Sequence, residues 1–310
     1  MELNITKFNK HQLNKYTADE DKAFELLIQL RWNGKPKCVH CGNDEKVYVL
    51  NVKKAKRKVL KCSKCRKQFS ALIGTIFEGS HIPLSVWLQA IYSMCSSKKG
   101  VAAYQLHREL GITYKSAWFM CHRIRHAMTQ EPLKSKLQGA IEVDETYVGG
   151  KGKGIKSRGR NTDSKTPVVT VMQRDGDVRS FKVNNVKSST LKKLISDNVD
   201  VQSDIYTDSF KSYKGLDKTF NSHETVDHSK KEYARGIIHV NFSESYNSLL
   251  KRGLIGTFHH ISYQHLDRYL SEFDFKWNTR HVTDGTRMIK AVKQIEGKRL
   301  MYKEPLSSET

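Results

Sequence analysis

Two Cys-x-x-Cys pairs constrain the fold of this chain more than any other feature of its sequence. The first pair is Cys38 and Cys41, and the second, Cys62 and Cys65, follows after twenty intervening residues. A two-residue spacer lets a tight turn point two sulfur atoms at one ion, and zinc prefers four thiolates in a tetrahedron. Disulfides and redox thiols are the alternatives, but a reducing compartment disfavours disulfides and a redox motif needs only one pair. The spacing therefore predicts a zinc ribbon over residues 36–70 that holds a structural Zn²⁺.

The chain carries a large positive charge, which points to a polyanionic partner. It has 54 Lys and Arg against 32 Asp and Glu, a formal net charge of +22. The first 140 residues contain 25 of the basic and 10 of the acidic side chains, and residues 51–67 contain nine basic side chains and no acidic one. Nucleic acid is the commonest partner for such an excess, although a basic run alone is also typical of a solvated face. Between the cysteine pairs basic and apolar residues alternate, which predicts a β-hairpin with a phosphate-contacting face.

The sequence argues against two classes of protein. No stretch approaches the ~18 apolar residues of a membrane span, and the N-terminal MELNITKFNK lacks the apolar core of a signal peptide. We therefore expect a cytoplasmic protein with no membrane partner. The glycine-rich segment 149–160 lacks the G-x-x-x-x-G-K-[ST] spacing of a nucleotide-binding loop, so we interpret it as a flexible cationic loop.

Residues 83–137 have a helical pattern that includes a helix-turn-helix. A first helix is predicted from Val101 to Leu110, Gly111 provides the turn, and Thr113 caps a second helix that begins at Tyr114. The second helix carries basic side chains that favour a DNA-reading role: Lys115, His122, Arg123, Arg125 and His126. An ordinary helical hairpin that packs on its neighbours is the alternative.

From residue 140 the sequence changes to β-branched apolar stretches that contain or end in acidic residues. Asp144 lies in IEVDETYVGG, and Asp208 lies at the end of the strand-like DIYTD. Glu244 lies in HVNFSESYNSLLKRG, at the expected start of a helix. Both aspartates are predicted at the ends of adjacent strands. Two such aspartates, with an acid on a facing helix, can hold a pair of Mg²⁺ or Mn²⁺ ions, because hard cations need oxygen ligands. Three like charges are costly to bring together without a cation, so the pattern predicts a two-ion catalytic site.

Three further residues near these acids have a weaker claim to the site. Glu142 and Glu145 flank Asp144, and we expect both to point to the opposite face of the strand, which makes them second choices. Lys251 follows Glu244 by seven residues, nearly on the same helix face, where a cation can hold a DNA phosphate. A solvent-exposed lysine without a role is the alternative.

Together these features resemble the DDE transposases of bacterial insertion sequences, in the branch with an N-terminal zinc ribbon and an ISXO-type catalytic domain. The resemblance covers roughly residues 15–282. It is carried by CVHCG with CSKC, VDETYVGGKGKG, YTDSFKSY, DHSKKEY, HVNFSESYNSLLKRGLIGTFHHIS and YLSEFDFKWNTR. The family's catalytic acids fall on Asp144, Asp208 and Glu244, and its downstream basic residue falls on Lys251.

The resemblance implies an α/β fold with a ribonuclease-H-like mixed sheet and helices on both faces. With the sequence patterns it predicts five segments. They are a helical leader (1–35), the zinc ribbon (36–70), a helix-turn-helix DNA-binding region (83–137), the DDE catalytic domain (140–282) and a polar C-terminal tail that frays (283–310).

The resemblance also implies an activity. The protein would bind the terminal inverted repeats of its element, cleave DNA to leave 3′-hydroxyl ends and join those ends to target DNA, with Mg²⁺ or Mn²⁺ as cofactor. We expect a homo-oligomer that pairs the two ends, associated with the bacterial nucleoid. A ribonuclease-H-like nuclease that cleaves but never joins DNA, and a zinc-ribbon DNA-binding regulator without catalysis, are the alternatives.

Overall fold

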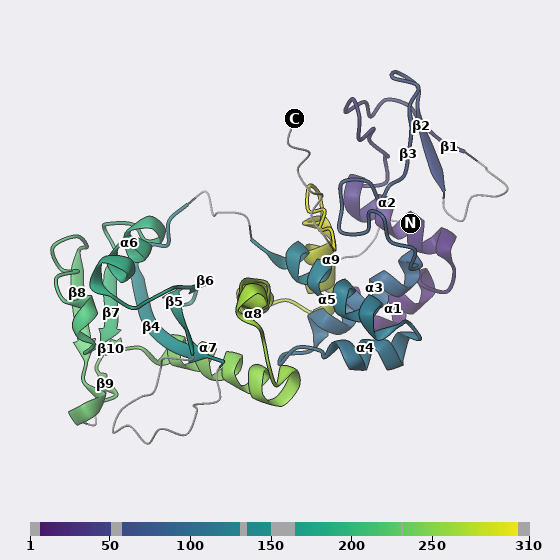
Figure 1. Ribbon diagram of the computed structural model, residues 1–310. Coiled ribbons are helices and arrows are strands. Elements are labelled where there is room, and N and C mark those ends of the chain that lie inside the picture. Colours follow the sequence, from purple (N-terminus) through teal and green to yellow (C-terminus); the bar gives the residue numbers. More distant parts are fainter. Residues whose placement is uncertain (1–6, 51–57, 131–134, 150–164, 231, 303–310) are drawn as a thin grey trace, which may run out of the picture. The chain divides into compact units, whose positions relative to one another are not determined.

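The chain folds into two compact units. A computed structural model describes residues 7–50, 58–130, 135–149, 165–230 and 232–302 (Figure 1). The first unit comprises Met1–Met128 and His281–Thr310, and the second comprises Thr129–Arg280. The four paired cysteines therefore belong to the first unit, and the predicted catalytic acids belong to the second.

The ribbon in the first unit is a three-stranded antiparallel sheet. Its strands β1 (Val47–Leu50), β2 (Val59–Cys62) and β3 (Gln68–Phe69) lie in the order β1-β2-β3. The pairing of β1 with β2 runs from Val47 opposite Cys62 to Leu50 opposite Val59, which confirms the predicted hairpin pairing. Leu60 is buried and its neighbour Lys61 is half-buried, so the two faces of β2 differ as the alternating pattern predicts. Residues 51–57 of this hairpin, like most of the glycine-rich segment 149–160, lie outside the described residues.

Helices form the rest of the first unit. They are α1 (Lys10–Tyr16), α2 (Glu20–Trp32), α3 (Leu84–Ser96), α4 (Ala103–Leu110), α5 (Tyr114–Met128) and α9 (Asp284–Lys293). The predicted helix-turn-helix is present as α4 and α5. Gly111 between them has a φ of 63°, a left-handed conformation that glycine adopts without steric cost. The Thr113 hydroxyl caps α5 by accepting the Ser116 backbone N–H at 3.2 Å.

The prediction that the basic residues of α5 face DNA is wrong for three of them. His122, Arg123 and Arg125 are at most 4% exposed, because the last three turns of α5 are surrounded by the other helices of the unit. Arg123 donates to the Glu78 backbone carbonyl, and its guanidinium lies 5.5 Å from the ring centroid of Trp87. Arg123 therefore belongs to the core, with its charge directed at buried acceptors.

The prediction of a fraying tail from residue 283 is also wrong. Residues 284–293 form α9, and Thr283 caps it by accepting the Thr286 backbone N–H at 3.2 Å. The apolar side chains of Met288, Val292 and Ile295 are buried at helical spacing, although polar residues surround them in the sequence. This short amphipathic stripe packs α9 against α3 and completes the first unit.

The second unit contains a five-stranded mixed sheet in the order β6-β5-β4-β7-β8. The strands are β4 (Ala140–Val148), β5 (Thr166–Gln173), β6 (Val178–Lys182), β7 (Asp204–Asp208) and β8 (Ser222–Val226). β5 runs antiparallel to β4 and β6, whereas β7 runs parallel to β4 and β8. This topology, with helices on both faces, confirms the predicted ribonuclease-H-like fold.

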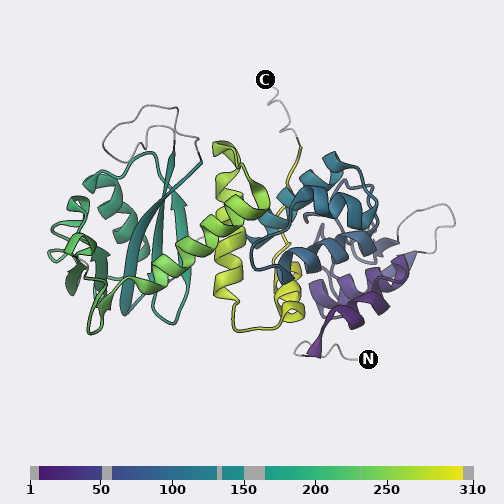
Figure 2. The same ribbon diagram turned by 90° about the horizontal axis from the view of Figure 1, so that it is seen from below.

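The helices of this unit cover both faces of the sheet (Figures 1 and 2). On one face α6 (Ser188–Asn198) packs Leu191 and Ile195 against Ile141 and Val143 of β4. On the other face α7 (Asn241–Gly253) and α8 (Leu266–Asn278) pack against β5 and β6. Short elements join them: η2 (Lys211–Tyr213), η3 (His228–Lys230), β9 (Ala234–Arg235), β10 (Ile238–His239), η4 (Leu254–Phe258) and η5 (Tyr263–His265). None of the helices in the described ranges is long and apolar enough to cross a membrane.

The packing of α9 predicts the effect of one added methyl group. A Cβ at Gly285 would lie 1.9 Å from the Phe8 carbonyl oxygen, so one backbone has to move. We expect Gly285→Ala to lower the free energy of unfolding by about 1–3 kcal/mol, the usual cost of overpacking, in chemical denaturation of the full chain. Lys290→Ala, an exposed change on the same helix, serves as the control and should change it by less than about 0.5 kcal/mol. Equal stability of the two variants would contradict the packing of α9.

Candidate active site and zinc site

The two cysteine pairs are held by matching turns. The Cys38 backbone N–H donates to the Asn43 carbonyl at 2.8 Å, and the Cys62 N–H donates to the Lys67 carbonyl at 3.1 Å, five residues on in both cases. The residue after each second cysteine is left-handed: Gly42 has a φ of 74° and Arg66 a φ of 60°. The two knuckles thus share one backbone design, as the repeated spacing predicts.

The four sulfur atoms form a compact group. Cys38 Sγ lies 3.7 Å from Cys65 Sγ, and Cys41 Sγ lies 3.7 Å from Cys62 Sγ. A tetrahedron with Zn–S bonds of about 2.3 Å has S···S edges of about 3.8 Å, so the sulfurs are placed as zinc requires. The group therefore fits structural zinc.

The backbone around the second knuckle favours a thiolate. Hydrogen bonds from the backbone of Cys65 and then Lys64 lower the pKa of Cys62 to about 6, against the opposing effect of burial. A backbone hydrogen bond from Lys67 lowers the pKa of Cys65, but burial and the other thiols outweigh it and raise this pKa to about 11. The backbone thus favours the ionised form of Cys62, the form in which a cysteine binds a metal.

The three predicted catalytic acids come from three adjacent elements of the second unit. Asp144 is the central residue of β4, Asp208 ends the neighbouring parallel strand β7, and Glu244 lies in the first turn of α7. Asp208 Oδ1 accepts the Phe210 backbone N–H at 3.0 Å, which fixes it at the strand end. Asp208 and Glu244 lie where the patterns predict, whereas the expected strand end at Asp144 is wrong, because the pairing of β4 with β5 continues to Val148.

Electrostatics show that these carboxylates act on one another. Burial raises the pKa of Asp144 to about 6, and the charges of Asp208 and Glu244 add to the increase, while a hydrogen bond from Asn247 opposes it. Burial likewise raises the pKa of Glu145 to about 7, with Asp208 as the next cause. Carboxylates that repel one another in a partly buried place are a cluster that a cation would stabilise.

The expectation for Glu142 is wrong, because alternate residues of a strand share a face and Glu142 therefore points to the same side as Asp144. It is fully buried and does not face the other acids. Its Oε2 accepts the backbone N–H groups of Phe242 and Ser243 at 2.9 and 3.0 Å, and so caps α7 from the sheet. Its Oε1 lies 2.8 Å from Arg174 Nε.

Glu145 is on the opposite side of β4 from Asp144, as expected. Its Oε2 accepts the hydroxyl of Tyr213, a buried residue of the α6-side core, at 2.8 Å. It is nevertheless close enough to Asp208 for the repulsion described above. Alternation along β4 predicts the side on which Glu145 lies, but it does not predict this interaction with Asp208, which belongs to another strand.

Lys251 and His228 lie at the exposed margin of the site. Lys251 is on α7, seven residues after Glu244, and its side chain is exposed. His228 Nε2 lies 3.3 Å from Glu244 Oε1. His228 belongs to the DHSKKEY motif, one of the segments that carry the family resemblance.

Sequence reasoning also missed Asn247. Its side-chain nitrogen donates to Asp144 Oδ2 at 2.8 Å, and its oxygen accepts the Thr170 hydroxyl at 2.8 Å. The helical spacing that places Lys251 near the face of Glu244 places Asn247 between them, so the same pattern contains the signal for it.

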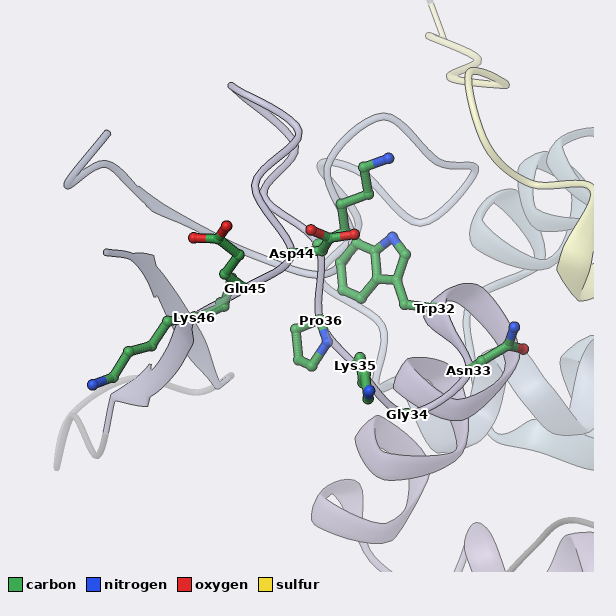
Figure 3. A pocket seen from close by; sticks show the side chains of 10 residues that line it. Trp32, Asn33, Gly34, Lys35, Pro36, Asp44, Glu45 and Lys46 are labelled. Carbon is green, nitrogen blue, oxygen red and sulfur yellow. The ribbon is translucent and has the colours of Figure 1, made fainter. Parts of the chain in front are cut away.

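A cavity of about 780 Å³ lies in the first unit, between the end of α2 and the ribbon (Figure 3). Trp32, Asp44 and Lys46 are among the residues that line it. Its lining mixes both signs of charge and contains none of the four cysteines, so we assign no chemistry to it.

Comparison with known proteins matches both parts of the chain to transposase domains. A family described as the ISXO2-like transposase domain matches residues 136–278, and a transposase zinc-ribbon domain matches residues 18–68. An uncharacterized protein in transposable element ISH50 of Halobacterium salinarum is 29% identical over 274 residues, which cover 84% of this chain and 91% of that protein. An uncharacterized transposase-like protein of Haemophilus influenzae is 32% identical over 113 residues, 36% of this chain and 90% of that protein.

One solved structure has a more remote similarity to this chain. The Mos1 transposase paired-end complex with left transposon end is 13% identical, with a TM-score of 0.30, over 67% of this chain and 75% of that one. This likeness is too weak to support a conclusion.

The fold, the acids and the ribbon, with these matches, define the protein as a transposase. The chain belongs to the family that combines an ISXO2-like transposase domain with an N-terminal transposase zinc ribbon.

The zinc site predicts a local loss of structure when one ligand is removed. We expect Cys62→Ser to release zinc from the full chain and to expose the backbone amides of residues 59–69 to rapid hydrogen exchange, because metal binding contributes folding free energy. The strands of the second unit should keep their protection. Ser63→Ala, in the same knuckle, is the control and should retain zinc. A ribbon that keeps its protection in the metal-free Cys62→Ser variant would refute structural zinc.

Proposed function

We propose that the protein binds the terminal inverted repeats of its own element, cleaves DNA to leave 3′-hydroxyl ends and joins those ends to target DNA. The observation that carries the proposal is the meeting of Asp144, Asp208 and Glu244, from two parallel strands and a facing helix, at mutually repelling positions. Family membership supports the same activity. We also infer that a homo-oligomer acts, since two element ends have to be paired.

The donor set suits hard divalent cations. Asp144, Asp208 and Glu244 supply carboxylate oxygens, which Mg²⁺ and Mn²⁺ prefer, and repulsion among them leaves a demand for positive charge. Within the described parts of the chain, the four cysteines are the group whose donor atoms all lie within 4.8 Å of one another, and the three acids do not form such a group. Two ions about 3.5–4 Å apart do not require all the ligand oxygens to lie within one coordination sphere.

Residues of this chain would orient the DNA around these acids. When bound, two cations supply Lewis acidity to the attacking and leaving oxygens of a phosphodiester. The exposed ammonium group of Lys251 would hold a DNA phosphate beside the site. His228, next to Glu244, would limit the freedom of that side chain.

We further propose that the exposed side of the helix-turn-helix contacts the element end. Tyr104 and Tyr114 are 57% and 51% exposed, and their ring centroids lie 6.3 Å apart. The Arg108 guanidinium lies 5.3 Å from the Tyr104 ring, and Lys115 is exposed at the start of α5. Helix-turn-helix proteins contact base edges with the first turn of the second helix. The positively charged side chains of Arg108 and Lys115 are suited to contact phosphates.

This DNA-contacting surface predicts a salt-dependent loss of affinity. We expect Arg108→Ala and Lys115→Ala each to weaken binding to the inverted repeat and to reduce the slope of log affinity against log salt by about one, measured by fluorescence anisotropy. Lys193→Ala, an exposed lysine of α6, is the control and should leave the slope unchanged. Variants of Arg108 and Lys115 with the wild-type slope would show that DNA binds elsewhere.

The catalytic acids predict a separation of binding from chemistry. We expect Asp208→Ala to bind the inverted repeat like the wild type and to lose cleavage and joining by more than about 100-fold, since removing partners of metal ligands alone costs 10–100-fold. Binding is measured by anisotropy, and cleavage and joining are measured on labelled element ends with Mg²⁺. Asp197→Ala, an exposed acid of α6, is the control. Unchanged chemistry in Asp208→Ala would refute the proposed active site.

A further inference from the structure

We infer that Asn247, held by Thr170, is a positioning residue that orients the Asp144 carboxylate for cation binding. The inference rests on the proposed function in taking Asp144 as a cation ligand. It concerns an uncharged part of the second unit to which neither the acid pattern nor the family resemblance assigns a role.

The three residues meet because of the sheet register. Asp144 and Thr170 are directly opposite each other on the antiparallel strands β4 and β5, so their side chains leave the sheet on the same face. Asn247 approaches that face from α7. Its nitrogen donates to Asp144 Oδ2 and its oxygen accepts the Thr170 hydroxyl, both at 2.8 Å.

The donors and acceptors of Asp144, Asn247 and Thr170 allow only one orientation of the Asn247 amide. An ionised carboxylate only accepts hydrogen bonds, so the NH₂ group of Asn247 has to face Asp144. The amide oxygen then faces Thr170, whose hydroxyl donates to it. If the amide turned over, two oxygens would face each other across 2.8 Å, and the Thr170 hydroxyl would lose its acceptor.

Burial makes this orientation effective. Thr170 is fully buried and Asn247 is 3% exposed, so water does not compete for these hydrogen bonds. A buried polar group without its partner costs about 1–3 kcal/mol, which is the penalty that holds the amide in place. The plane of the Asp144 carboxylate is thereby fixed by a neutral donor, and its negative charge is kept for a cation.

The same contact fixes the helix that carries the third acid. Asn247 lies three residues after Glu244 and four before Lys251, so the three side chains form one stripe of α7. Glu244 and Lys251 are exposed at the two ends of this stripe, whereas Asn247 is buried in its middle. Anchoring Asn247 to β4 and β5 therefore sets the position of α7 along the sheet.

The test measures cation binding directly on the full-length, zinc-loaded protein, with Mn²⁺ as the probe and electron paramagnetic resonance as the readout. We expect Asn247→Leu, which keeps the number of side-chain heavy atoms, to raise the Kd for Mn²⁺ by about 10–100-fold, the usual cost of losing a hydrogen bond to a metal ligand. Thr170→Val should weaken Mn²⁺ binding in the same direction, because the amide oxygen then loses the donor that holds the plane of the amide. Thr170→Ser keeps the hydroxyl and should bind Mn²⁺ like the wild type.

Each outcome separates this inference from the proposed function. Asp144→Asn should abolish the Mn²⁺ signal, and if it binds Mn²⁺ like the wild type the proposed active site itself is wrong. If Asp144→Asn loses Mn²⁺ but Asn247→Leu binds it with the wild-type Kd, the inference alone is overturned. Equal weakening in Thr170→Ser and Thr170→Val would show that the hydroxyl does not orient the amide. If Asn247→Leu does not fold, the two Thr170 variants decide the question.

Discussion

The candidate active site depends on a buried carboxylate that fastens a helix to a sheet. Glu142 leaves β4 on the face of Asp144 and accepts two backbone N–H groups in the first turn of α7. The positive end of a helix dipole and the guanidinium of Arg174 both stabilise its charge in the core. Glu244 lies in that same turn, so its distance from the strand acids is set by Glu142. Breaking a buried pair of this kind costs about 3–5 kcal/mol, which makes the placement rigid.

Two acids on one face of β4 thus have different roles because their partners differ. Glu142 contacts Arg174 and the N-terminus of α7, and these two groups balance its negative charge within the fold. Asp144, two residues on, meets the neutral amide of Asn247 and the repulsion of other carboxylates. Of these two environments, the second leaves a carboxylate with an unmet demand for positive charge, and this contrast distinguishes the structural acid from the proposed catalytic one.

Local spacing was enough to predict much of this architecture. The cysteine pairs, the turn at Gly111, the strand end at Asp208 and the helix start at Glu244 are short-range patterns, and the structure confirms where they lie. The side of β4 that Glu142 occupies also follows from alternation, and the sequence reasoning applied that rule wrongly. What could not be predicted needs partners distant in sequence. The burial of Arg123 requires Glu78 and Trp87, and the docking of α9 requires α3. The link from Thr170 through Asn247 to Asp144 requires the sheet register.

The net charge of +22 has a clearer meaning once burial is known. Several basic residues of the first unit lie in its core, so the surface proposed to contact DNA is narrower than the sequence suggests. The central claim is that the acids around Asp144 both cut and join DNA. The most direct measurement is a strand-transfer assay with the wild-type protein, Mg²⁺ and pre-cut inverted-repeat ends carrying 3′-hydroxyl groups. Covalent joining of these ends to target DNA, abolished when the ends carry 3′-deoxy termini, is the predicted result. Cleavage of uncut ends without any joining of pre-cut ones would contradict it and would identify a nuclease.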